Sequence, residues 1–136
     1  MSSAPTRPGL VNAFKVSCHA TTLLVLLQAA LAGLFISGEE SGAQDQHEVM
    51  ANVLFLAVAV QLVLAFLVRG WGQFRLMYWV AVLLVLSIAQ IGLGYASEDN
   101  TLPEAIHIPL GVFTFGLALV ISTLAIVEDR PRGSAA

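Results

Sequence analysis

This sequence has very few charged residues. Lys, Arg, Asp and Glu make up 11% of its 136 residues, and 57% are hydrophobic, whereas soluble domains carry roughly 25% charged residues. So few charged side chains cannot cover the surface of a soluble domain, so the composition indicates an integral membrane protein. The six basic residues form no cluster, which argues against nucleic-acid binding.

Cysteine is nearly absent as well. The single residue, Cys18, excludes an intramolecular disulfide. One cysteine and three histidines do not supply the closely spaced set of about four ligands that a structural zinc site needs. Cys18 is most simply a small packing residue at the start of an apolar run.

Long apolar runs dominate what is present. Each is about 20 residues long, enough for a helix to cross ~30 Å of hydrocarbon, and none has a charged residue at its centre. We therefore predict an all-α, integral membrane four-helix bundle over residues 16–127, between tails at 1–15 and 128–136. The predicted spans are about 16–36, 47–68, 77–96 and 105–127.

The charges predict an orientation. The two loops 37–46 and 97–104 contain acidic residues and no basic one. By the positive-inside rule, both termini and the link between the second and third helices are cytoplasmic, in a prokaryotic plasma membrane. All six basic residues fall on this predicted inner side: Arg7, Lys15, Arg69, Arg75, Arg130 and Arg132.

The two halves of the chain share a pattern. Gln28 in QAALAG and Gln90 in QIGLG are each followed by small residues, an acidic loop and a helix that opens with His47 or His107. Two parallel helix pairs of this kind would be related by an axis along the membrane normal. We expect that axis to bring the two histidines to matching depths on opposite sides of the bundle.

Two facing histidines can hold a haem iron, one from each side. Glycines beside them would make room for the porphyrin, and Glu48 could orient an imidazole. The alternatives without a cofactor are that the histidines are ordinary interfacial residues, that the glutamines form hydrogen bonds between helices, and that the glycines serve helix packing. The predicted cofactor-binding residues are His47, His107, Gln28, Gln90, Gly94 and Gly111, with the two histidines as metal ligands.

The repeated unit resembles the four-helix half-module of the haem A synthase family, over roughly residues 28–125. It is also similar to small actinobacterial four-helix membrane proteins. In the synthases, histidines at the outer ends of the second and fourth helices bind b-type haem or the haem substrate, so the resemblance implies that His47 and His107 are axial ligands. Synthases have two such halves and an arginine after the first histidine, whereas this chain has one half and reads DQHEVM. The resemblance therefore implies one haem b and electron transfer, and not haem A synthesis.

Three functions remain open on the sequence alone. The first is a membrane b-type cytochrome, acting with other membrane redox subunits or as a homo-oligomer. The second is a cofactor-free accessory or assembly subunit, in which the histidines bind nothing. A small transporter is a third, but the helix centres lack the ionisable groups that ion-coupled carriers place there. One feature opposes haem, because the outer side has no Arg or Lys to pair with propionates.

Overall fold

The computed structural model describes residues 8–38, 42–69, 74–97 and 101–127. These residues form four helices: α1 (Pro8–Ser37), α2 (Ala43–Leu67), α3 (Phe74–Ala96) and α4 (Thr101–Val127). All four are long and apolar enough to cross a membrane, which confirms the all-α, membrane-spanning prediction. Of the predicted tails at 1–15 and 128–136, residues 8–15 belong to α1, and residues 1–7 and 128–136, with Arg7, Arg130 and Arg132, lie outside the described residues.

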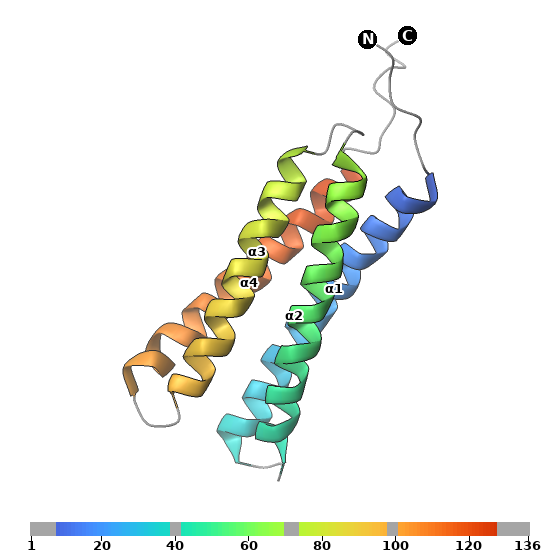
Figure 1. Cartoon of the computed structure of the whole chain (residues 1–136). Coiled ribbons are helices and arrows are strands. Elements are labelled where there is room, and N and C mark those ends of the chain that lie inside the picture. Colours follow the sequence, from blue (N-terminus) through green and yellow to red (C-terminus); the bar gives the residue numbers. More distant parts are fainter. Residues whose placement is uncertain (1–7, 39–41, 70–73, 98–100, 128–136) are drawn as a thin grey trace.

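The helices alternate in direction around a square. Helix α1 packs on α2 and α4, and α3 packs on the same two helices, so α1 and α3 are diagonal to each other, as are α2 and α4 (Figure 1). We call the end where α1 begins and α4 ends the link end, because α2 also leads to α3 there. The opposite end, which contains the starts of α2 and α4, is the histidine end.

The helices extend beyond the apolar runs. Helix α1 begins at Pro8, well before the run at 16–36, because proline suits the first helical position, where its missing amide costs no hydrogen bond. At the histidine end, Gly38 and Gly42 have φ of 69° and 88°. These left-handed values favour glycine and let the chain reverse between α1 and α2. Helix α4 continues through Pro109.

The tightly packed core lies in the link half of the bundle. None of the largest fully buried side chains belongs to the histidine half of its helix. They are Phe14, Cys18 and Thr21 on α1, Val58 and Gln61 on α2, Leu76, Val80 and Leu83 on α3, and Ile121 on α4.

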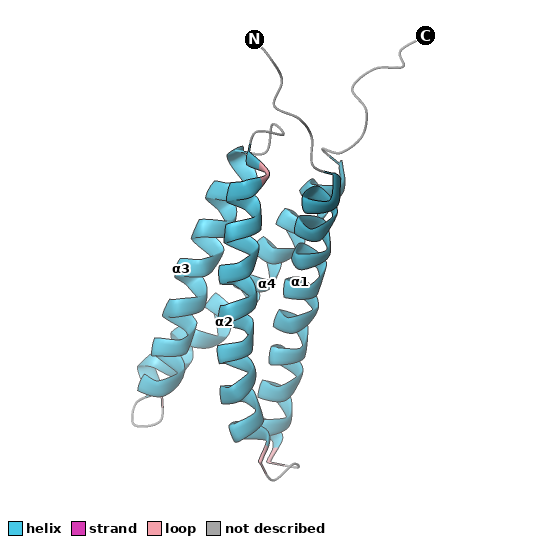
Figure 2. Ribbon diagram, turned by 45° about the vertical axis from the view of Figure 1, so that its right-hand side comes forward, coloured by secondary structure: helices cyan, strands magenta, loops and turns pink. Residues whose placement is uncertain are grey.

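The histidine half is more open. The α1–α2 pair and the α3–α4 pair lie close together at the link end and diverge toward the histidine end, as two views show (Figures 1 and 2). This divergence explains why the large core residues stop halfway along the bundle. Side chains that join the two pairs at the histidine end must therefore reach across the space between diverging helices.

Candidate functional site

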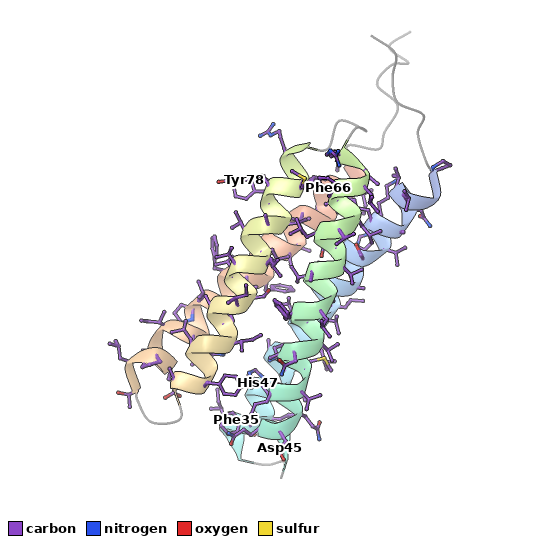
Figure 3. The ribbon with its side chains drawn as sticks, in the orientation of Figure 1. Phe35, Asp45, His47, Phe66 and Tyr78 are labelled. Atoms are coloured by element: carbon purple, nitrogen blue, oxygen red, sulfur yellow. The ribbon has the colours of Figure 1, made fainter. Side chains whose placement is uncertain are left out.

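The two histidines of the repeated pattern meet between the diverging helix pairs. Their ring centroids are 6.2 Å apart, with an angle of 69° between the ring planes. His47 projects from α2 toward the α3–α4 pair (Figure 3). Because α2 and α4 are diagonal, the two imidazoles approach each other across the bundle and not along one helix–helix seam.

The His47 ring is held by Gln28 on the adjacent helix. Nδ1 of His47 lies 3.2 Å from the backbone oxygen of Gln28. A carbonyl oxygen can only accept, so Nδ1 carries the proton and Nε2 keeps its lone pair. The Gln28 side chain completes the exchange, since its Nε2 donates to the backbone oxygen of His47 over 2.9 Å.

This arrangement is the one that metal-binding histidines use. Such a histidine usually donates its second ring N–H to a carbonyl or carboxylate, which fixes the tautomer and turns the other nitrogen toward the metal. The acidic neighbour plays no such part here, because the carboxylate of Glu48 accepts from Gln44 instead, at 3.2 Å. The orienting group is therefore a backbone carbonyl, which a sequence pattern does not reveal.

The second histidine has similar neighbours on α3. The backbone of Gln90 lies close to the His107 ring, but the buried Nδ1 of His107 makes no hydrogen bond. A Cβ on Gly94 would lie 3.6 Å from Cε1 of His107. A Cβ on Gly111 would lie 3.0 Å from Nε2 of Gln90. A side chain at Gly111 would therefore press on Gln90, whereas a Cβ at Gly94 would make an ordinary contact with His107.

The structure therefore gathers the six predicted site residues into one connected group. His47 contacts Gln28 and faces His107, and the remaining three residues adjoin His107 or its glutamine. The group joins all four helices.

Of the five buried side-chain polar atoms without a hydrogen bond in the described residues, three belong to this group, and the other two, on Thr21 and Gln61, lie in the link half. Oε1 of Gln28, Oε1 of Gln90 and Nδ1 of His107 are buried and make no hydrogen bond. A buried polar atom left unpaired costs about 1–3 kcal/mol, so each such atom calls for an explanation. Three unpaired atoms in one group are expected where a ligand binds among them.

The contact between the rings fits two arrangements. Aromatic rings that simply pack together prefer edge-to-face geometry at ~4.5–7 Å, which includes this pair. A metal ion bonded to two opposed imidazoles at about 2 Å each would place the ring centroids roughly 6 Å apart. The centroid separation of 6.2 Å is therefore compatible with a metal shared by the two rings.

The described residues contain no cluster of three or more His, Cys, Asp or Glu side chains suited to a metal ion. A metal held here would have two protein ligands. A bare zinc ion requires more, whereas a haem iron requires only two ligands from the protein.

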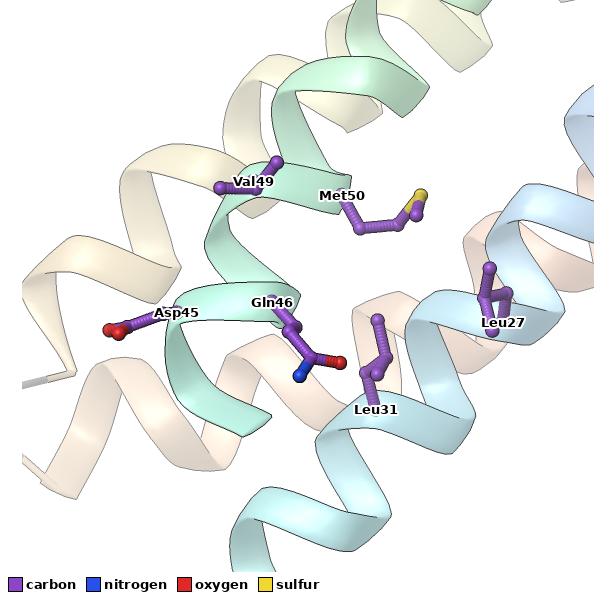
Figure 4. Close-up of a pocket in the computed structure, with 6 residues that line it drawn as sticks. All are labelled: Leu27, Leu31, Asp45, Gln46, Val49 and Met50. Carbon is purple, nitrogen blue, oxygen red and sulfur yellow. The ribbon is translucent and has the colours of Figure 1, made fainter. Parts of the chain in front are cut away.

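A separate cavity of about 370 Å³ lies near the histidine end, between α1 and α2 (Figure 4). Its walls are mainly apolar, with Asp45 and Gln46 at the start of α2. Neither His47 nor His107 lines it. The cavity is therefore distinct from the histidine group.

Sequence reasoning missed a set of polar contacts in the link half. Ser122 Oγ lies 2.6 Å from Nδ1 of His19, which joins α4 to α1. Gln61 donates to Sγ of Cys18 over 3.3 Å. These partners are 103 and 43 positions apart in the chain, and no local pattern connects them.

Comparisons with protein-family models, with curated proteins and with solved structures find no match for this chain. The function must therefore be argued from the site itself.

Proposed function

We propose that this protein is a b-type cytochrome of a prokaryotic plasma membrane that holds one haem b between His47 and His107. The observation that carries the proposal is the pair of imidazoles facing each other across the bundle at 6.2 Å, with Nε2 of His47 left free by the bond to Gln28. The buried unpaired atoms of Gln28, Gln90 and His107 support a missing group at this level.

Haem suits the site better than a bare ion. Two protein ligands are sufficient, because the porphyrin supplies the other four. The porphyrin would lie between the two helix pairs, where Gly94 and Gly111 present no side chain. Gln28 and Gln90 act as positioning residues through their backbone and amide groups. Bound haem supplies one-electron redox chemistry, and two axial histidines leave the iron no open position for oxygen.

The internal repeat and the orientation belong to the same proposal. The α1–α2 pair contributes Gln28 and His47, and the α3–α4 pair contributes Gln90 and His107, as expected of two units related by an axis along the membrane normal. The link end, with Lys15, Arg69 and Arg75, faces the cytoplasm. The haem then lies near the outer face, as the resemblance to a haem A synthase half-module implies. Partners are other membrane redox subunits or further copies of this chain.

The proposal is tested with the dithionite-reduced minus air-oxidised absorption spectrum of the purified protein. We expect the sharp α and Soret bands of a low-spin b-type haem. His47→Ala and His107→Ala should each abolish these bands, and His19→Ala, on the other half of the bundle, should retain them. A folded, colourless protein purified from cells supplied with excess haem would rule the proposal out.

One observation favours a second function. The ring pair at 69° is also a stable edge-to-face contact that closes the bundle without a cofactor. In that case the chain is an accessory subunit of a membrane complex. The same spectrum separates the two functions, because only the cytochrome is coloured.

A further inference from the structure

A second polar group lies in the link half of the bundle, where α1 meets α4. His19 and Ser122 are joined there through Nδ1 and Oγ at 2.6 Å. One turn of α1 further on, Oγ1 of Thr22 lies 3.0 Å from the carbonyl of Cys18 and 3.2 Å from the carbonyl of Ala118. The proposed haem site uses none of these residues.

These residues line an open, groove-like cavity of about 460 Å³ on the surface between α1 and α4. Its polar wall consists of His19, Thr22, Ser122 and Thr123, and the other lining side chains are leucine, isoleucine and valine of the same two helices. Ligand sites of ~300–1,000 Å³ with mostly apolar walls and a few polar groups are typical of proteins. His19 is exposed on the surface of the bundle, so a ligand reaches this cavity from the lipid.

The hydrogen bonds within the protein leave the second ring nitrogen of His19 available to a ligand. Thr123 donates to the carbonyl of Leu119, and Thr22 donates to carbonyls, so these hydroxyl protons are used within the protein. The hydrogen bond of His19 uses Nδ1 and leaves Nε2 for a further partner. If Ser122 donates to Nδ1, Nε2 donates to a ligand carbonyl. If Nδ1 donates to Ser122, Nε2 accepts from a ligand hydroxyl.

The lining defines the ligand class. Among the described residues, those that line the cavity include no Asp, Glu, Lys or Arg, so none of them would neutralise a phosphate head group. A neutral, lipid-soluble molecule with a carbonyl or a hydroxyl group fits this lining, because Nε2 of His19 can bind either group according to its tautomer. We infer that the α1–α4 cavity binds the head group of a membrane quinone or quinol at Nε2 of His19.

This inference rests on the proposed function, because a quinol is an electron donor that shares the bilayer with a haem. On α1, His19 and Gln28 are 28 − 19 = 9 residues apart, which is about 14 Å along a helix. The two sites thus lie at different levels of one bundle, the quinone site toward the link end and the haem site at the histidine end. The inference concerns binding, and it can be measured without electron transfer.

The test is photolabelling with an azidoquinone of the full-length protein in lipid nanodiscs, followed by mass spectrometry of the labelled peptides. We expect label on α1 and α4 near His19 and Ser122. Excess decylubiquinone or menadione should protect against it, and excess diacylglycerol should not. His19→Leu should weaken quinone binding roughly tenfold, the equivalent of one hydrogen bond.

Two further variants guard against a folding defect. Leu119→Trp fills the cavity while leaving His19 in place, and it should also abolish labelling. Gln46→Leu alters the separate cavity between α1 and α2, and it should label as the wild type does. Unchanged labelling in both His19→Leu and Leu119→Trp, or protection by diacylglycerol, would overturn the inference.

The haem and quinone results remain separable. The His47→Ala variant lacks the proposed haem ligand but keeps the α1–α4 cavity, and it should label normally. A red protein without specific labelling would refute the quinone site alone. Specific labelling of a colourless protein would refute the cytochrome and leave the quinone site standing.

Discussion

At the scale of single residues, Gln61 is unusual because it is polar and almost completely buried. Only 1% of its surface is exposed. Its amide nitrogen donates to sulfur, a weak acceptor, and its Oε1 has no partner among the described residues. Gln61 therefore contributes little to stability through its hydrogen bonds.

Replacing Gln61 by leucine tests this reasoning. Gln61→Leu keeps most of the volume and removes an unpaired buried oxygen, so we expect unfolding at or above the wild-type temperature. Gln61→Ala leaves a cavity and should be about 2–5 kcal/mol less stable than the leucine variant. Thermal unfolding in detergent measures both. A leucine variant less stable than alanine would contradict the packing argument.

Gly111 lies on the same face of α4 as His107, because the two are four residues apart. Gly116, nine residues from His107, lies on the opposite face, and a Cβ there meets nothing within 4 Å. Gly111→Leu should displace Gln90 and exclude the porphyrin, whereas Gly116→Leu should retain haem. The haem-to-protein ratio of each purified variant provides the measurement. Equal haem content in both would place the porphyrin elsewhere.

The repeat in the sequence was sufficient to expect that His47 and His107 face each other. The orienting groups could not be predicted in the same way. The proton on Nδ1 of His47 is held by a backbone carbonyl, and every residue has one. No sequence pattern indicates the Ser122–His19 contact either, because its partners are far apart in the chain and only tertiary packing brings them together.

At the scale of the helices, hydropathy predicted four helices long and apolar enough to cross a membrane but not where they begin. The predicted run began at residue 16, whereas α1 begins at Pro8 and includes the buried core residues Val11 and Phe14 before that run. The inward face was also unpredictable. In lipid, both faces of a helix are apolar, so side chains turned outward and inward look alike in sequence.

The connection between α1 and α2 gives a prediction at this scale. Gly38 has φ of 69°, a conformation that costs an L-residue roughly 1–2 kcal/mol. Gly38→Ala should lower the free energy of unfolding by about 1 kcal/mol. Gly33→Ala is the matched control, since Gly33 is helical and a Cβ there has free space. The control should be neutral or stabilising, and a larger loss there than at Gly38 would refute the conformational explanation.

At the scale of the whole molecule, the orientation in the membrane can be measured directly. Cys18 is 1% exposed and should not react with maleimides, so the wild-type chain already serves as a background. In intact cells, an impermeant maleimide should label Gln44→Cys at the exposed start of α2. It should label Arg75→Cys, exposed at the link end, only after lysis. The reverse pattern would invert the proposed orientation and place the haem near the cytoplasm.

The uneven packing of the bundle has a consequence for assembly. The large core side chains are confined to the link half, and the two helix pairs diverge toward the histidine end. The link half can pack as soon as the helices are inserted, before any cofactor binds. The proposed haem would then enter between the α1–α2 and α3–α4 pairs from the side and bind His47 and His107, without any helix leaving the membrane.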